Sequence, residues 1–122
     1  MYSSCAYSRP QLFDVAQGLD YLHSHKVIHG VLKGVRDYPR LCFVRILIPG
    51  QTNILVDVQG HARIVGFRFA KVTPSEVPGQ IVSNQHVGSK QWSAPEVLED
   101  GEMSQKADIF SFAMVMIEAC HG

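Results

Sequence analysis

With 122 residues, the chain is one domain at most. Its 11 Lys and Arg residues balance 11 Asp and Glu residues, so the charge gives no indication of nucleic acid or an anionic membrane as a partner. No apolar run approaches the ~20 residues of a membrane span, and residues 1–10 lack the basic start and apolar centre of a secretory signal. The three cysteines are odd in number and far apart, which favours free thiols in a reducing compartment, so we expect an intracellular, cytoplasmic protein.

The first predicted element is a helix over residues 11–25. Its apolar positions recur at helical spacing on one face, namely Leu12, Val15, Ala16, Leu19 and Leu22. A short strand over residues 26–28 follows. Two apolar, β-branched runs, residues 54–57 and 62–65, flank a turn at Val58-Gln59-Gly60-His61, and this pattern predicts a β-hairpin.

The second half of the chain begins with a segment, residues 72–88, that is rich in Pro, Gly, Ser and Val without any period. This composition is typical of a mobile loop. Pro95 fits the first turn of a short helix through residue 98. Residues 104–120 predict a second long helix, which is normally buried because it is apolar nearly all round. Its apolar residues are Ile109, Phe110, Phe112, Val115, Met116 and Ile117.

Five segments carry motifs, and they follow one another in a familiar order. They are His29-Gly30-Val31-Leu32-Lys33, Asn53-Ile54-Leu55-Val56-Asp57, Ile64-Val65-Gly66-Phe67-Arg68-Phe69-Ala70, Gly88-Ser89-Lys90-Gln91-Trp92-Ser93-Ala94-Pro95-Glu96 and Lys106-Ala107-Asp108-Ile109-Phe110-Ser111-Phe112. In turn they resemble the catalytic loop, its Asn-bearing end, the Asp-Phe-Gly strand, the Ala-Pro-Glu end of the activation segment and the start of the central helix of protein kinases. The chain therefore resembles the protein kinase family and, within it, the tyrosine-kinase-like class, which includes many serine/threonine kinases.

This resemblance implies a fold class of α+β, mainly helical, over residues 11–122, with residues 1–10 unassigned. The fold would be a fragment of the C-terminal lobe: a helix, the catalytic loop, a β-hairpin, the activation segment and the central helix. The small lobe and the later helices of the large lobe would be absent, so the chain would be cut at both ends. We then expect the central helix to expose apolar surface, which a protein partner could cover.

Residues 35–51 interrupt the catalytic loop. In the family the metal-binding Asn follows the catalytic Asp by five positions, whereas Asn53 lies 22 positions after Val31. Removing these 17 residues, or 51 nucleotides, restores the spacing. The first codon encodes Val and begins with GU, and the last encodes Gln and can end in AG, as an intron does. We interpret the segment as a translated, unspliced intron. The alternative is a genuine loop insertion, although its apolar run, residues 41–48, is unusual for a loop.

The resemblance also implies roles for the residues of the active site. Val31 stands at the position of the catalytic Asp, and Gly66 at that of the metal-binding Asp, with Arg68 replacing the glycine of Asp-Phe-Gly. Lys33 matches the lysine that touches the transferred phosphate, although it could be a solvated surface lysine. Asn53 matches the second metal ligand, although it could be a turn residue. The family uses ATP and Mg²⁺, but with both carboxylates replaced we expect neither to bind well and no metal site to be intact.

The remaining matched positions are structural or bind the nucleotide. His29 and Phe67 match an apolar stack between the catalytic loop and the activation segment. Asp108 matches a helix aspartate that hydrogen-bonds the backbone around His29, and it could equally be an acid favoured by the helix dipole. Leu55 matches the residue beneath the adenine ring, or is plain core. Glu96 matches a glutamate whose arginine partner would lie beyond the last residue of the chain.

Three functional interpretations follow. The first is a kinase-homologous fragment without phosphotransferase activity, and the second is a pseudokinase that serves as a binding module. The third interpretation, an active serine/threonine kinase, is the least favoured, because nothing in the sequence replaces the missing acids. The spacing of His23, His25 and His29 could suggest zinc, but they straddle a helix end and a strand with no cysteine nearby, so we expect no zinc site.

Overall fold

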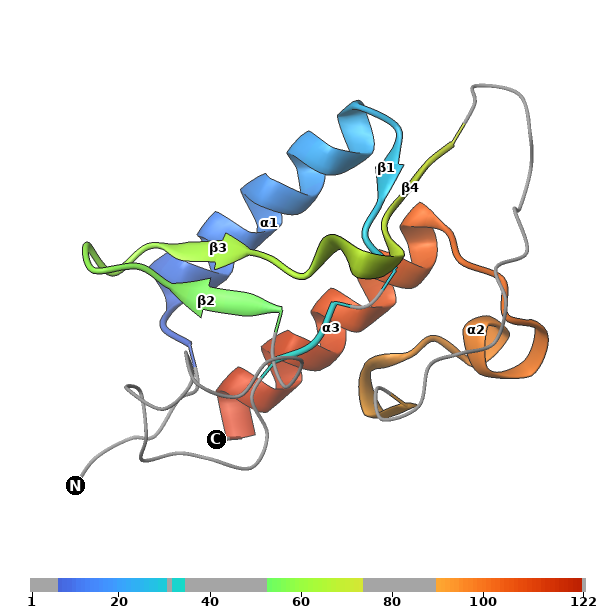
Figure 1. Ribbon diagram of the computed structural model, residues 1–122. Coiled ribbons are helices and arrows are strands. Elements are labelled where there is room, and N and C mark those ends of the chain that lie inside the picture. The colour runs from blue at the N-terminus through green and yellow to red at the C-terminus, as the bar shows by residue number, and fades with distance from the viewer. Residues whose placement is uncertain (1–6, 31, 35–52, 74–89, 122) are drawn as a thin grey trace.

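The structure is a computed structural model, and it describes residues 7–30, 32–34, 53–73 and 90–121 (Figure 1). It has a mixed helix and strand composition, as expected for an α+β fold that is mainly helical. The elements in chain order are α1 (Arg9–Ser24), β1 (Val27–Ile28), β2 (Ile54–Val56), β3 (Ala62–Ile64), the 3-10 turn η2 (Phe67–Phe69), β4 (Lys71–Val72), the 3-10 turn η3 (Lys90–Trp92), α2 (Pro95–Asp100) and α3 (Gln105–His121). Val31, the predicted insertion at residues 35–51 and most of the predicted loop at residues 72–88 lie outside the described residues.

Helix α1 is confirmed, but it begins two residues before the predicted start. Ser8 caps it: the Gln11 N–H donates to Ser8 Oγ at 3.4 Å, and the Ser8 N–H donates to Gln11 Oε1 at 2.9 Å. Such a reciprocal capping box satisfies two backbone donors that the helix leaves unpaired. Gly18 lets α1 approach the hairpin closely, since a Cβ there would lie 3.2 Å from Ile64 Cδ1.

The predicted hairpin is confirmed as the antiparallel pair β2 and β3, in which Ile54 faces Ile64 and Val56 faces Ala62. The Asp57 carboxylate organises the turn, because it accepts the N–H groups of Gln59 and His61, each at 2.9 Å, and the Arg63 Nε–H at 3.0 Å. A second antiparallel pair joins β1 to β4. In Figure 1 the hairpin lies along α1, and β1 leads from the end of α1 to the first turn of α3.

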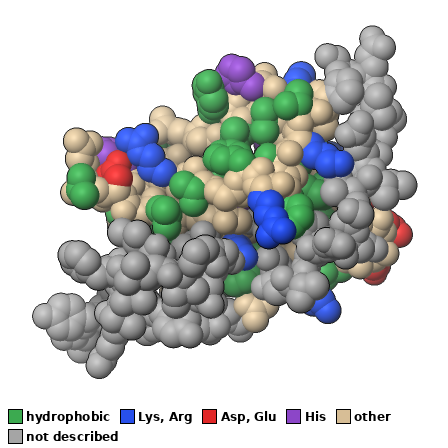
Figure 2. Space-filling view, viewed as in Figure 1, with side chains coloured by type: hydrophobic (Ala, Val, Ile, Leu, Met, Phe, Trp, Pro, Cys, Tyr) green, Lys and Arg blue, Asp and Glu red, His purple; other side chains and the backbone are tan. Residues whose placement is uncertain are grey.

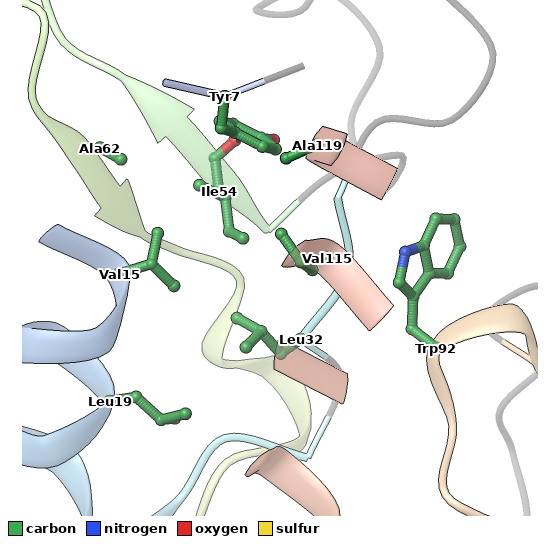
Figure 3. Packing of buried hydrophobic residues seen from close by; sticks show 9 residues of the cluster. All are labelled: Tyr7, Val15, Leu19, Leu32, Ile54, Ala62, Trp92, Val115 and Ala119. Carbon is green, nitrogen blue, oxygen red and sulfur yellow. Dashed lines mark hydrogen bonds between the residues drawn. The ribbon is translucent and has the colours of Figure 1, made fainter. Parts of the chain in front are cut away.

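The core lies between α1, the hairpin and α3, where side chains from all three elements point toward one another (Figure 3). Its buried residues are Tyr7, Val15, Leu19, Leu32, Ile54, Ala62, Trp92, Val115 and Ala119. Tyr7 belongs to the segment that the sequence left unassigned, yet it is 2 % exposed and its hydroxyl donates to the Ile54 carbonyl at 3.2 Å. Residues 7–10 are therefore part of the folded unit.

Helix α3 is apolar on two sides, and only one of them is buried. Val115 and Ala119 pack in the core, whereas Ile109 and Ile117 are 53 % and 51 % exposed. The expectation that this helix is buried all round is wrong for the described residues, while the expectation that it exposes apolar surface is confirmed. Figure 2 shows hydrophobic side chains among Lys and Arg side chains on one face of the molecule. Among the described residues, no helix is both long and apolar enough to span a membrane.

Candidate active site

Asp108, in the first turn of α3, holds the backbone of His29 and Gly30 in place at the base of the site. Its carboxylate is 2 % exposed and accepts three hydrogen bonds. The His29 N–H donates to Oδ2 at 2.8 Å, the Gly30 N–H donates to Oδ1 at 2.9 Å, and His23 Nε2 lies 2.9 Å from Oδ2. A buried carboxylate costs free energy unless donors surround it, and here three donors do. The contacts fix the start of the Gly30–Lys33 loop to α3.

His23 is the residue of this anchor that the sequence did not identify. It lies on α1, 85 residues from Asp108, and its side chain is 12 % exposed. Gln105 strengthens the junction, because its Nε2–H donates to the His23 carbonyl at 3.1 Å. In the sequence, His23 stands out only through its spacing from His25 and His29, which could suggest zinc but for which we expect no zinc site. Among the described residues, no group of three or more His, Cys, Asp or Glu side chains could hold a metal ion.

His29 joins the loop to the segment that follows β3. Its ring is buried, and Nε2 lies 2.7 Å from the Val65 carbonyl, to which a neutral Nε2–H donates. Burial lowers the pKa of His29, and the hydrogen bond to Val65 and the charge of Asp108 oppose this only in part. The ring also meets Phe67 edge-on, with centroids 5.3 Å apart and an interplanar angle of 66°. Phe67 remains 49 % exposed on its other side.

Lys33, Asn53 and Gly66 converge above this anchor. The Asn53 N–H donates to the Lys33 carbonyl at 3.2 Å, and the Val65 N–H donates to the Asn53 carbonyl at 2.8 Å. Gly66 adopts the left-handed conformation, with φ 74° and ψ 55°. A Cβ on Gly66 would lie only 2.0 Å from Asn53 Oδ1. Asn53 therefore faces Gly66, and its amide fills the space where a side chain at residue 66 would begin.

The charges around this convergence are positive. Lys33 is partly buried, and burial lowers the pKa of its ammonium group. Arg68 is exposed, with its guanidinium carbon 5.5 Å from the centre of the Phe69 ring. Gly66 itself offers no oxygen from a side chain. The position at which the resemblance predicts a metal ligand therefore offers no side-chain oxygen, and a cationic side chain lies two residues away.

Two further residues complete the predicted set. Leu55 is partly buried and pairs with Arg63, and because side chains alternate along a strand it points away from the core that Ile54 fills. That placement disfavours the plain-core interpretation of Leu55. Glu96 lies in the first turn of α2.

Gly30 lies between the Asp108 contacts and the group formed by Lys33, Asn53 and Gly66, and it shapes the chain there. Its φ of 89° is left-handed, and a Cβ there would lie 1.8 Å from Met103 Cε. The loop thus passes so close to Met103 that only a residue without a side chain fits the present packing. Gly30, Met103, Ser104 and Asp108 also line a small pocket under the loop.

Comparisons with known proteins agree with this layout. The family model of the protein kinase domain matches residues 50–122. LysM domain receptor-like kinase 3 of Arabidopsis thaliana is 32% identical over 109 residues, which cover 89% of this chain and 15% of that protein. The probable serine/threonine-protein kinase PBL18 of the same plant is 32% identical over 110 residues, which cover 90% of this chain and 24% of that protein. The serine/threonine-protein kinase STY17 is 29% identical over 109 residues.

The chain thus spans 15% and 24% of the first two relatives, so it corresponds to a part of each. Both the family model and these relatives describe protein kinases, and together they cover the loop, the hairpin and α3. The chain therefore belongs to the protein kinase family.

Proposed function

We propose that this chain is a kinase-fold module, built from part of the C-terminal lobe, that has lost metal-dependent phosphotransfer. The observation that carries the proposal is the contact between Gly66 and Asn53. Gly66 stands where the family has a metal-binding Asp, and the Asn53 amide fills the space in which that side chain would start. A carboxylate is missing from this position, and an Asp there would collide with the Asn53 amide unless that side chain turned away.

The chemistry of phosphoryl transfer makes this loss decisive. The reaction depends on positioning the nucleophile and on neutralising charge with Mg²⁺, rather than on covalent catalysis by the protein. A carboxylate that orients the hydroxyl commonly contributes a rate factor of about 10²–10⁴. The bound metal contributes several kcal/mol of charge stabilisation. Val31 and Gly66 stand at the two positions that would supply these carboxylates.

In this proposal, a nucleotide would meet the chain at Lys33, Asn53 and Leu55. Lys33 could contact a phosphate, and Leu55 lies on the outer side of the hairpin, where an adenine could rest. Asn53 alone is a weak substitute for a metal site, because Mg²⁺ binds carboxylates in preference to a single amide oxygen. We therefore propose that any nucleotide binding is weak and does not depend on Mg²⁺.

The test compares thermal shifts of the chain with ATP, with ATP and Mg²⁺, and with ATP and a chelator. In parallel, transfer of labelled phosphate to the chain and to a general protein substrate is measured. We expect no labelled product and the same shift with and without Mg²⁺. A matched Lys33→Met variant provides the control, because labelling that requires Mg²⁺ and disappears in this variant would contradict the proposal.

The second candidate function is a pseudokinase binding module. It is favoured by the intact anchor around Asp108 together with the exposed apolar side of α3. A chain that keeps its scaffold and exposes a hydrophobic surface has the properties of an interaction domain. This candidate predicts a saturable protein contact that tolerates Lys33→Met, whereas residual catalysis predicts the loss of function in that variant.

A further inference from the structure

A small pocket lies where the chain at Gly30 meets the first turns of α3. Its polar wall includes the side chains of Ser104, Asp108 and Ser111. The space open to the centre of a water molecule is about 10 Å³. A buried water needs about 10–15 Å³ and two to four polar partners, whereas a pocket lined only by apolar groups stays dry. The pocket therefore has the size of one water molecule, and its wall has the polarity that holds one.

Helix geometry brings these three polar side chains together. Ser104 directly precedes α3, and the Asp108 N–H donates to its carbonyl at 3.2 Å. Steps of four and three residues separate Ser104, Asp108 and Ser111, which is the spacing of side chains on one face of a helix. Asp108 and Ser111 are 2 % and 8 % exposed. Because bulk solvent barely reaches them, a further hydrogen bond of either residue is made inside the pocket.

The carboxylate of Asp108 has capacity for one more hydrogen bond. An ionised carboxylate has about four positions at which it accepts. Two donors meet Oδ2, namely His23 Nε2 and the His29 N–H, and the Gly30 N–H meets Oδ1. One accepting position of Oδ1 therefore remains for a donor that the described residues do not supply.

The two serines supply the other half of the account. Ser111 Oγ lies 2.6 Å from the Trp92 carbonyl and 3.1 Å from the Ala107 carbonyl, so its single proton is donated within the fold. Its lone pairs can still accept a hydrogen bond. Ser104 Oγ accepts the Ala107 N–H at 3.0 Å, and its own proton can be donated to an acceptor. The polar wall thus offers two acceptors and one donor.

We propose that this pocket binds one structural water molecule, which donates to Asp108 Oδ1 and Ser111 Oγ and accepts from the Ser104 hydroxyl. Three hydrogen bonds are the usual number for a buried water. Since Asp108 also holds the Gly30 N–H and Ser111 holds the Trp92 carbonyl, the water connects the chain at Gly30 with the segment before α2. The proposal is independent of the loss of phosphotransfer, because it concerns the Asp108 contacts and not Gly66.

The same contacts disfavour a cation such as Na⁺ in this pocket. The N–H groups of His29 and Gly30 and the ring of His23 all direct the positive ends of their dipoles at the Asp108 carboxylate. These donors offset the negative charge that would attract a cation. A neutral molecule that can donate twice and accept once matches the wall better.

Oxygen-17 relaxation dispersion of the solvent tests the proposal, because it counts water molecules that stay bound for longer than the protein takes to rotate. It detects oxygen, so exchanging serine protons do not contribute. The wild-type chain should hold one such water more than Ser104→Ala, which removes the proposed donor. Ser104→Ala also removes the cap of the Ala107 N–H. Ser8→Ala is therefore the matched control, since it removes the cap of α1 and should keep the water.

Ser111→Thr provides a second, independent variant. It keeps the hydroxyl that bonds the Trp92 and Ala107 carbonyls and adds a methyl group to a pocket of about 10 Å³, so it should displace the same water. Equal water counts for wild type and Ser104→Ala overturn the proposal. If circular dichroism shows that Ser104→Ala is unfolded, equal counts for wild type and Ser111→Thr overturn it instead. Sodium-23 relaxation that responds to the wild type but not to Ser111→Thr would assign the pocket to a cation and overturn it as well.

Discussion

The two sides of the Gly30–Lys33 loop contrast sharply. Beneath the loop, Asp108 is buried and accepts hydrogen bonds from His23, His29 and Gly30 at 2.8–2.9 Å. Above the loop, Gly66 carries no side chain and touches the amide of Asn53. The lower side consists of contacts that hold the chain in its conformation, and these are complete. On the upper side, Gly66 offers no carboxylate, and the charged side chains Lys33 and Arg68 are positive.

This difference separates two requirements that an active kinase must meet together. The contacts of Asp108 depend only on the chain itself, so they contribute to folding whether or not a substrate binds. The carboxylates of a metal site repel each other and gain free energy only when the cation arrives. Once catalysis is not required, the second set can be replaced without loss of the fold, while the first set cannot.

The largest expected effect is on the lower side. Asp108→Ala leaves the N–H groups of His29 and Gly30 and the His23 ring without their acceptor, so we expect unfolding to become easier by about 3–5 kcal/mol. Urea denaturation measures the change. Asp108→Asn, which keeps the volume but faces the donors with an amide N–H group, should cost less than Asp108→Ala. Asp100→Ala, at the exposed end of α2, is the control and should change stability by less than about 0.5 kcal/mol. A loss below about 1 kcal/mol for Asp108→Ala would mean that the anchor does not stabilise the fold.

The upper side gives the next effect. Gly66→Asp introduces a Cβ at 2.0 Å from Asn53 Oδ1, at a residue with φ of 74°, so we expect a loss of about 2–4 kcal/mol. Restoring the family's acid should also fail to create Mg²⁺ affinity, which calorimetric titration measures. Adding Asn53→Gly to Gly66→Asp should recover part of the stability because it removes the collision. Tight Mg²⁺ binding by Gly66→Asp alone would show that the upper side lacks only a carboxylate.

Two glycines with left-handed φ, Gly60 and Gly30, allow backbone strain to be separated from crowding by neighbouring atoms. Gly60, with φ of 88°, has nothing within 4 Å of an added Cβ, so Gly60→Ala should cost about 1 kcal/mol from backbone strain alone. Gly30→Ala adds contact with Met103 Cε, the end of a flexible side chain that can turn away, so we expect about 1–2 kcal/mol. Denaturation of the two variants side by side measures the difference. A Gly30→Ala cost equal to that of Gly60→Ala would mean that Met103 yields freely.

The contrast between the two sides also explains what the sequence could predict. Two local patterns predicted elements that the structure confirms. The helical periodicity of Leu12, Val15 and Leu19 predicted α1, and the turn at Gly60 predicted the hairpin. The two outward isoleucines of α3 could not be distinguished from its buried residues, because the apolar pattern runs nearly all round the helix. The third donor to Asp108 comes from His23, 85 residues away, and no local pattern marks such a contact.

The upper side shows the same limit. The glycine at residue 66 in place of the family's acid could be read from the motif, but the close approach of the Asn53 amide to Gly66 could not. That contact depends on how residues 53 and 66 meet at the ends of the hairpin, which is a property of the packed structure. Tyr7 was missed for a similar reason. A single aromatic residue before a helix has no period, and only its burial against Ile54 makes it part of the core.

The smallest effect concerns the His29 ring, which connects the two sides. Because burial lowers the pKa of His29 below its ordinary value of 6.5, the unfolded chain binds a proton more readily than the folded chain does. Above pH 6.5 both forms are neutral at this residue and it has no effect on the pH dependence. As the pH falls below 6.5 the unfolded form gains the proton first, so stability decreases, by at most about 1.4 kcal/mol per pH unit for one proton, until the pH reaches the lower pKa of the folded state. His29→Gln, whose amide can still donate to the Val65 carbonyl, should flatten this slope in urea denaturation between pH 7 and pH 5. His61→Gln, at an exposed residue of the hairpin turn, should leave more of the slope intact. An equal slope for wild type and His29→Gln would mean that the buried ring takes up its proton without opposing the fold, and the coupling between the two sides would then not depend on a neutral His29.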